Sequence, residues 1–148
     1  MAEILVVTGE AFYLKTLLEV LEEQEGLRTR TARSGVEALE HLKSGRAEEK
    51  MVCTDLSFNI GDVSLVHEDE KHLVRNGFAA GVVLLRRIKE WRSDFPVVLL
   101  TSWREGSPPR VLAEPEKFDG AVLFRGELYD MVAEIKALWD KLVLKNHK

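Results

Sequence analysis

The sequence has a single cysteine, Cys53, and four prolines among its 148 residues. One cysteine forms neither an internal disulfide nor a zinc site built from several cysteines, which excludes the disulfide-rich secreted class. Long apolar runs are missing as well, and the N-terminal run at residues 4–7 is too short for a signal peptide or a membrane span. The sequence therefore predicts a cytoplasmic protein without a membrane segment.

An excess of charge of one sign is also absent. The chain carries 21 Lys and Arg against 25 Asp and Glu, a net charge of −4. Because no dense basic block is present, attraction to a phosphate backbone or to anionic lipid is weak, and neither nucleic acid nor a membrane is an expected partner. Apolar residues at 45% and charged residues at 31% suffice for a core, so we expect one globular domain over residues 1–148.

Two motifs for ligand binding or catalysis are missing. The segment Thr8-Gly9-Glu10 has one glycine and one hydroxyl beside a carboxylate, too little to cradle the phosphates of a flavin or nucleotide. No Gly-x-Ser-x-Gly sequence is present, and His41 and His147 lie far from any expected strand end, so no Ser/His pair of a hydrolase is expected. We therefore expect that the protein is not an enzyme, and a small nucleotide- or flavin-binding α/β domain stays open as a second alternative.

Short apolar runs alternate along the chain with stretches in which apolar residues recur at the helical period. The expected strands cover residues 4–7, 27–32, 51–56, 96–101 and 119–124. The expected helices carry apolar stripes at residues 14–21, 36–42, 81–91 and 128–142. Ser34 with Glu37 has the capping-box spacing that begins the second helix. Strands joined by helical crossovers predict an α/β fold, a doubly wound sandwich with a five-stranded parallel sheet covered on both faces.

Ligands of such folds bind beyond the carboxyl ends of the strands. The residues expected at that edge are Thr8, Gly9, Glu10, Asp55, Thr101, Ser102, Phe124 and Arg125. This short set contains two carboxylates, three hydroxyls and one basic side chain, and we expect the function to depend on it.

In order and spacing, five segments resemble the phosphoacceptor receiver domains of two-component response regulators, and the resemblance covers essentially the whole chain. They are residues 4–10 (first strand and its acidic turn), 32–39 (start of the second helix), 52–56 (phosphoacceptor strand), 76–88 (approach to the third helix) and 96–102 (fourth strand). The resemblance implies the flavodoxin-like receiver fold and a role in two-component signal transduction.

The resemblance also implies roles for individual residues. Asp55 matches the phosphoacceptor, and Thr101 matches the supporting hydroxyl. The family's lysine after the fifth strand matches Phe124 or Arg125, depending on a one-residue gap, and we favour Arg125 because only it supplies a positive charge.

The cation site departs most from the family pattern. Receivers take the ligands of their divalent cation mainly from two adjacent acidic residues after the first strand, and Thr8 and Gly9 stand there. Glu10 reaches the site only if the turn shifts by one residue, so a Mg²⁺ site formed by Glu10 and Asp55 is expected to be weak. No cofactor is therefore expected, except Mg²⁺ if the chain is a working phosphoacceptor.

Three interpretations of Asp55 stay open. In the first, Arg125 pairs with Asp55 in place of the ion, which makes an atypical receiver that acts by protein–protein interaction without Mg²⁺-dependent phosphorylation. In the second, a histidine kinase phosphorylates Asp55, because Asp55, Thr101 and a basic residue all remain. In the third, Asp55 is a solvated carboxylate. The expected partner is a protein: a histidine kinase, a downstream regulator or a second copy of the chain.

An insertion is expected before the fourth strand, because this stretch is longer than a receiver usually needs. Residues 64–67 and 72–75 mirror each other around four charged residues. Two such runs around a short loop predict a β-hairpin at residues 64–75.

In the register of that hairpin, His67 faces His72, and facing side chains of a sheet come close enough to share a ligand. With Glu68 or Glu70, the two imidazoles have the ligand types of a transition-metal site. A solvated histidine pair is the alternative.

Overall fold

The computed structural model describes residues 2–9, 11–55, 61, 63–71, 80–101, 118–123 and 127–145. Within them the strands are β1 (Ile4–Val7), β2 (Thr29–Ala32), β3 (Met51–Asp55), β4 (Val97–Thr101) and β5 (Gly120–Leu123). Neighbouring strands are parallel, and their order in the sheet is β2-β1-β3-β4-β5. The predicted doubly wound α/β fold is therefore confirmed, and each strand begins within two residues of its predicted start.

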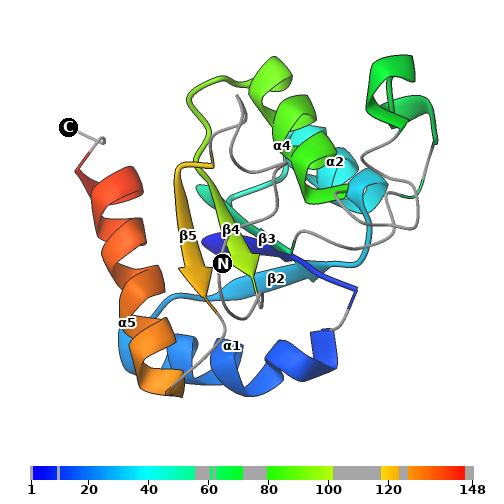
Figure 1. Cartoon of the computed structure of the whole chain (residues 1–148). Coiled ribbons are helices and arrows are strands. Elements are labelled where there is room, and N and C mark those ends of the chain that lie inside the picture. Colours follow the sequence, from blue (N-terminus) through cyan, green and yellow to red (C-terminus); the bar gives the residue numbers. More distant parts are fainter. Residues whose placement is uncertain are drawn as a thin grey trace.

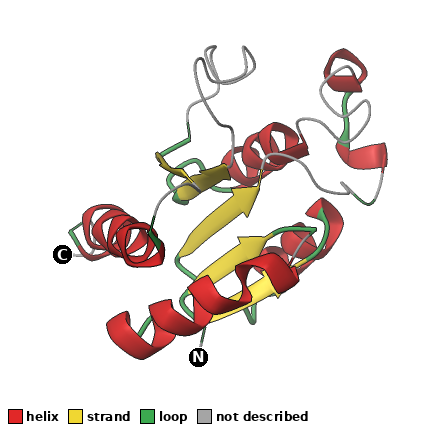
Figure 2. Cartoon of the chain, turned by 60° about the horizontal axis from the view of Figure 1, so that its bottom comes forward, coloured by secondary structure: helices red, strands yellow, loops and turns green. Residues whose placement is uncertain are grey.

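Helices of the described chain cover both faces of the sheet. They are α1 (Ala11–Glu25), α2 (Gly35–Lys43), α4 (Ala80–Trp91) and α5 (Leu128–Trp139), and α5 continues into a π-helical turn, Asp140–Leu144. On one face α1 packs against α5, and on the other face α2 packs against α4 (Figures 1 and 2). Right-handed crossovers between parallel strands produce this distribution. None of the described helices is long and apolar enough to cross a membrane.

Successive strand residues point into two different apolar cores. Ile4 and Val6 of β1 lie in the core beneath α1 and α5, whereas Leu5 and Val7 lie in the core beneath α2 and α4. All four are at most 1% exposed, because β1 lies inside the sheet and helices cover both of its faces, whereas the edge strand β2 keeps Arg30 and Thr31 exposed. For this reason an inner strand such as β1 was predictable from its unbroken apolar run.

Cys53 of β3 lies in the core beneath α1 and α5 and is buried. Burial raises the pKa of its thiol to about 12, so the thiol stays protonated at neutral pH and lacks the reactive thiolate form. We expect Ellman's reagent to label Cys53 slowly in the native protein and rapidly after denaturation. A thiol that reacts within the mixing time in the native protein would contradict this burial.

The start of α2 follows its predicted cap with one difference. The Ser34 side chain accepts a hydrogen bond from the backbone N–H of Glu37 at 3.1 Å, as the capping box requires. The Glu37 carboxylate accepts from the backbone N–H of Arg33 at 3.0 Å, one residue before the cap. The cap therefore also holds the backbone that leads from β2 into α2.

The predicted β-hairpin at residues 64–75 is wrong where the structure describes it. The chain forms two short 3₁₀ turns there, Val63–Leu65 and Glu68–Glu70. The physical reason is the side chain of Glu70, which is only 2% exposed, whereas a hairpin loop would leave it in solvent. The helical turn lets Glu70 accept a hydrogen bond from the backbone N–H of His67 at 2.9 Å. Residues 72–75, and with them the predicted pair of His67 and His72, lie outside the described residues.

Candidate functional site

The carboxyl ends of β1 and β3 bring Thr8 and Asp55 together. The two strands are neighbours, and their register pairs Val7 with Thr54, the residue before each of the two. Thr8 is fully buried, and its backbone N–H donates to the Ala32 carbonyl at 3.0 Å, which keeps it in line with β1. The Thr8 hydroxyl donates to Asp55 Oδ2 at 2.5 Å, so the two side chains bind each other directly.

The contact between Thr8 and Asp55 has a simple electrostatic meaning. A hydroxyl that donates to a carboxylate forms a charge-assisted hydrogen bond, which stabilises the ionised carboxylate without a cation. A second carboxylate at position 8 would instead repel Asp55 unless a cation lay between the two. The end of β1 therefore supplies Asp55 with a neutral hydrogen-bond donor.

Other predicted site residues are only partly described. Thr101 ends β4 beside Asp55, because the register of β3 and β4 pairs Asp55 with Leu100. The Thr101 side chain, and the whole of Glu10 and Arg125, lie outside what the structure describes. The predicted ion pair of Asp55 with Arg125 and the predicted Mg²⁺ site of Glu10 with Asp55 therefore stay predictions.

The sequence analysis expects Thr8 and Asp55 at the same edge of the sheet, but it does not predict the hydrogen bond between them. The signal that could have found it is the strand register. Thr8 and Asp55 both stand at the carboxyl ends of apolar runs, and adjacent parallel strands bring such ends side by side. The sequence does not state that the two strands are adjacent, so the contact required the structure.

A second polar cluster joins residues 63–71, the described part of the expected insertion and below called the inserted segment, to α4. We name it the Glu70 cluster: His67, Glu70, Arg86 and Arg87. Glu70 Oε2 accepts from Arg86 Nη1 and from Arg87 Nη2, both at 2.8 Å. Burial by itself raises the pKa of Glu70, but the hydrogen bonds from Arg86 and the His67 backbone, with both guanidinium charges, bring it below its usual value of 4.5. The carboxylate is therefore ionised at neutral pH although it is buried.

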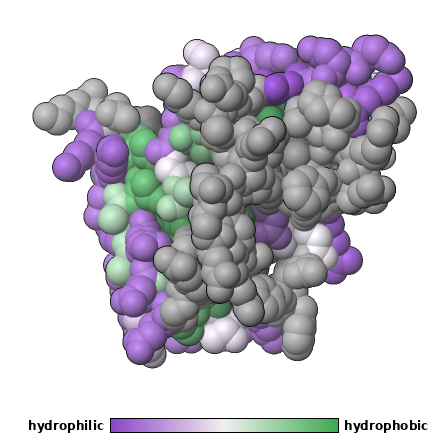
Figure 3. Space-filling view, in the orientation of Figure 1, coloured by the Kyte–Doolittle hydropathy of each residue, from purple (hydrophilic) through white to green (hydrophobic). Residues whose placement is uncertain are grey.

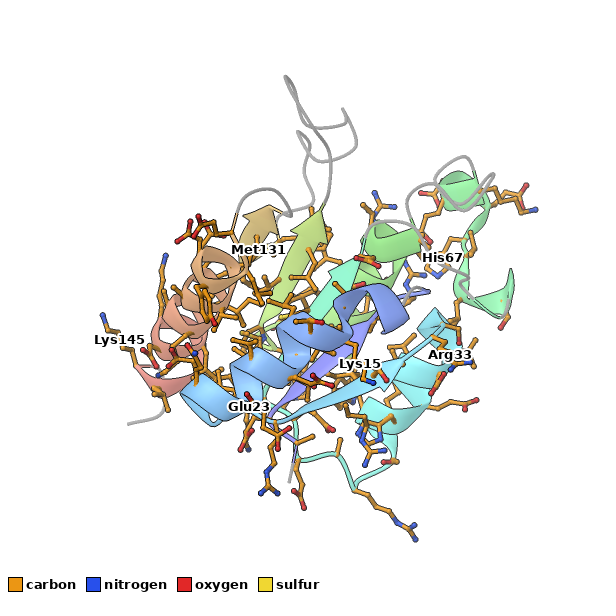
Figure 4. All side chains as sticks on the ribbon, turned by 90° about the horizontal axis from the view of Figure 1, so that it is seen from below. Lys15, Glu23, Arg33, His67, Met131 and Lys145 are labelled. Atoms are coloured by element: carbon orange, nitrogen blue, oxygen red, sulfur yellow. The ribbon has the colours of Figure 1, made fainter. Side chains whose placement is uncertain are left out.

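Arg87 holds both 3₁₀ turns of the inserted segment on α4. Its Nη1 donates to the Leu65 carbonyl at 3.1 Å and to His67 Nε2 at 2.5 Å. A guanidinium only donates, so His67 Nε2 is the acceptor in this contact. Figure 4 places His67 beside α4, on the side of the molecule away from α5. One nearly buried arginine thus anchors the segment at several points.

For the metal site predicted in this segment, the structure brings together a different set of residues. His67, Asp69 and Glu70 each offer one ligand atom, and these atoms lie within 4.8 Å of one another. Glu68, a member of the predicted set, is exposed and pairs with Lys71 at 2.7 Å. Two guanidinium groups bind Glu70, and one of them also binds His67, so fixed positive charge opposes a cation there. The cluster therefore favours ion pairing over metal binding.

Comparison with known proteins relates the chain to others by fold. No protein-family model and no curated protein matches the sequence. The structure is similar to the N-terminal domain of a response regulator/sensory box/GGDEF three-domain protein from Carboxydothermus hydrogenoformans, with a TM-score of 0.68 and 20% identity over 98% of this chain and 99% of that one.

Two further solved structures agree with this likeness. One is the signal receiver domain of a signal transduction histidine kinase from Syntrophus aciditrophicus, with a TM-score of 0.67 and 22% identity over 97% of this chain and 93% of that one. The other is a response regulator from Thermotoga maritima in complex with Mg²⁺-BeF, with a TM-score of 0.64 and 22% identity over 93% and 99% of the two chains. The chain therefore has the fold of the receiver domains of response regulators.

Proposed function

We propose that this chain is an atypical receiver domain that acts in signal transduction by binding other proteins, without Mg²⁺-dependent phosphorylation. The observation that carries the proposal is the hydrogen bond from the Thr8 hydroxyl to the Asp55 carboxylate. The fold supports it, because the resemblance to receivers gives Asp55 the position of the phosphoacceptor, at the end of β3.

The chemistry of phosphoryl transfer explains why Thr8 matters. Transfer to Asp55 needs a divalent cation that neutralises the transferring oxygens. Mg²⁺ takes oxygen ligands in octahedral geometry, and carboxylates hold it in most protein sites. At the end of β1 this chain has the Thr8 hydroxyl followed by Gly9, and that hydroxyl already binds an Asp55 oxygen. We therefore assign this edge a low cation affinity, and partner binding sets the signalling state.

The pairing of Arg125 with Asp55 belongs to the same proposal. An ionised carboxylate accepts several hydrogen bonds, so the Thr8 hydroxyl and a guanidinium are compatible partners for it. A double-mutant cycle between Asp55 and Arg125 measures their coupling. Absence of coupling would remove Arg125 from the proposal and leave the role of Thr8 standing.

A working phosphoacceptor with a histidine kinase as its partner is the second candidate function. It is favoured by the half-buried position of Asp55 at a strand end beside Thr101. In that case Mg²⁺ is a required cofactor. The two candidate functions therefore differ in their dependence on Mg²⁺.

Millimolar Mg²⁺ with beryllium fluoride is expected to leave the thermal midpoint of the protein unchanged, because a ligand stabilises only the state that it binds. A ligand present at about 100 times its Kd would raise the free energy of unfolding by about 2.7 kcal/mol. Scanning fluorimetry detects such a change as a shift of several degrees in the thermal midpoint. Intact-mass spectrometry after incubation with a small phosphodonor is expected to find no phosphoryl group on the chain. Asp55→Asn is the matched control. A Mg²⁺-dependent rise that this variant abolishes would contradict the proposal, and a phosphoryl group on Asp55 would establish the phosphoacceptor function instead.

A further inference from the structure

The inserted segment has a mostly polar contact with α4. The segment lies at the upper right of Figure 1, and Figure 3 shows hydrophilic atoms, in purple, at this corner of the molecule. Glu68, Asp69 and Lys71 are exposed, whereas Leu65 packs against the core beneath α2 and α4 and stays half-buried. Among the side chains that the structure describes here, apolar burial is therefore small, and release of the segment from α4 exposes little apolar surface.

The hydrogen bonds of this contact all run in one direction, because α4 supplies the donors and the segment supplies the acceptors. Arg87 Nη1 donates to the Leu65 carbonyl at 3.1 Å and to His67 Nε2 at 2.5 Å. Arg87 Nη2 and Arg86 Nη1 both donate to Glu70 Oε2 at 2.8 Å. The two adjacent arginines of α4 thus present a set of donors that suits carboxylate oxygens, and the segment fills it.

Glu70 leaves one donor of Arg87 without an acceptor. Both arginines bind the same carboxylate oxygen, Oε2, because the other oxygen, Oε1, accepts from the backbone N–H of His67 at 2.9 Å. Arg87 Nε is buried and has no hydrogen-bond partner among the described residues. A buried donor without an acceptor costs free energy, and a guanidinium binds a carboxylate best through two parallel N–H bonds. A carboxylate that brings a second oxygen to Nε therefore satisfies Arg87 more completely than Glu70 does.

We propose that Arg86 and Arg87 form a docking site for an acidic segment of a partner protein, and that Glu70 occupies this site as an internal competitor. A carboxylate of the partner takes the place of Glu70 on the two guanidinium groups, and its second oxygen accepts from Arg87 Nε. The inserted segment then leaves α4. One carboxylate replaces another in this exchange, so neither arginine is left as a buried charge without a partner.

The residue that fills the site now indicates the chemistry of the partner. Residues 68–70 are an acidic run, Glu68-Asp69-Glu70, and its last carboxylate lies on the arginines. These three acidic side chains leave together with the segment, which removes their repulsion of an incoming acidic chain. Glu90 of α4 stays, with its Oε2 3.2 Å from Arg87 Nη2, and compensates part of the arginine charge. The partner segment is therefore expected to carry acidic residues, as the inserted segment does.

This docking site goes beyond the proposed function and does not depend on the state of Asp55. It concerns α4 and the inserted segment, whereas the proposed function depends on Thr8 and Asp55 at the carboxyl ends of β1 and β3. Phosphorylation of Asp55 would contradict the proposed function and leave the docking site standing. Failure of the peptide experiments below would contradict the docking site and leave the role of Thr8 standing.

Binding of a fluorescein-labelled hexaglutamate peptide, measured by fluorescence anisotropy at low ionic strength, tests the site. Glu70→Gln removes the internal competitor, so we expect this variant to bind the peptide at least about tenfold more tightly than the wild type. Glu68→Gln removes the same charge from an exposed position of the same segment, and it is expected to bind like the wild type. Adding Arg86→Gln to Glu70→Gln is expected to abolish the gain. Circular dichroism checks that every variant is folded.

Hydrogen exchange of the wild-type chain provides a second measurement that needs no substitution. Millimolar hexaglutamate is expected to raise the exchange rates of the backbone amides of residues 63–71 at least about tenfold, because the peptide displaces the segment. Hexalysine at the same concentration is expected to have no effect. Unchanged exchange rates with hexaglutamate, or equal affinities of Glu70→Gln and Glu68→Gln, would overturn the proposal. Tighter binding of inorganic phosphate than of hexaglutamate by Glu70→Gln would overturn the choice of a carboxylate partner.

Discussion

Glu70→Gln is expected to lower the free energy of unfolding by about 3 kcal/mol, near the lower end of the range for breaking a buried ion pair. Glu70 is 2% exposed and Arg87 is 8% exposed, so the substitution leaves a nearly buried guanidinium without its carboxylate. The loss is at the lower end because Arg87 Nη2 also lies 3.2 Å from Glu90 Oε2, so the Glu90 carboxylate still compensates part of the Arg87 charge. Urea denaturation monitored by tryptophan fluorescence measures the change.

Glu68→Gln is the matched control for this measurement. Glu68 is two residues away, its side chain is 86% exposed, and its ion pair with Lys71 is at the surface. Surface pairs contribute little, so we expect a change of less than about 1 kcal/mol. Equal effects of the two substitutions would contradict the buried ion pairs that the structure gives Glu70.

The effect of Glu70→Gln is also expected to depend on pH. Burial raises the pKa of Glu70, but hydrogen bonds and the two guanidinium charges lower it further, to below 4.5 in the folded chain. A lowered folded pKa means that the stabilisation is fully present above 4.5 and is lost as the pH falls through the folded pKa. The difference between wild type and Glu70→Gln should therefore be constant near neutral pH and shrink in acid. A difference that grows in acid has the wrong sign for an ionised Glu70.

Thr8→Asp is expected to destabilise the protein by about 2 kcal/mol or more in the absence of divalent cations, and Mg²⁺ is expected to reverse the loss. The Thr8 hydroxyl lies 2.5 Å from Asp55 Oδ2, so the new carboxylate replaces a hydrogen-bond donor with a like charge. A divalent cation between two carboxylates removes that repulsion and adds binding energy to the folded state. Thermal denaturation with and without millimolar Mg²⁺ measures both effects.

Two further variants separate the causes of this response. Thr8→Asn changes the same buried position without adding charge, and its stability is expected to stay independent of Mg²⁺. Combining Thr8→Asp with Asp55→Asn removes the repulsion and the cation site together, so the response to Mg²⁺ should disappear. If Thr8→Asp responds to Mg²⁺ no more than wild type does, position 8 is not where a receiver cation would bind.

The strands could be predicted because their physical cause is local. An inner strand of a parallel sheet covered on both faces needs apolar residues at consecutive positions, so the run from Ile4 to Val7 was sufficient to place β1. The cap of α2 could be predicted for the same reason, since Ser34 and Glu37 are only three residues apart. In both cases the residues that form the pattern lie within a few positions of each other in the sequence.

The inserted segment and the Thr8 contact depend instead on residues distant in sequence. The mirrored runs around residues 68–71 have the composition of strands, but the partners that bury Glu70 are Arg86 and Arg87 on another helix. The donor to Asp55 comes from Thr8, 47 residues earlier in the chain. Neither partner can be identified without knowing which elements are adjacent.

The buried position of Cys53 also allows the opening rate of the protein core to be measured. Cys53 lies in β3, which pairs with β1 on one side and with β4 on the other. Its side chain lies in the core beneath α1 and α5, so a reagent reaches the sulfur only when that core opens, and slow labelling under native conditions measures this opening. When labelling is faster than reclosing, its rate equals the rate constant of that opening. The lifetime of the closed core around Cys53 is therefore measurable from a natural residue, without an engineered cysteine.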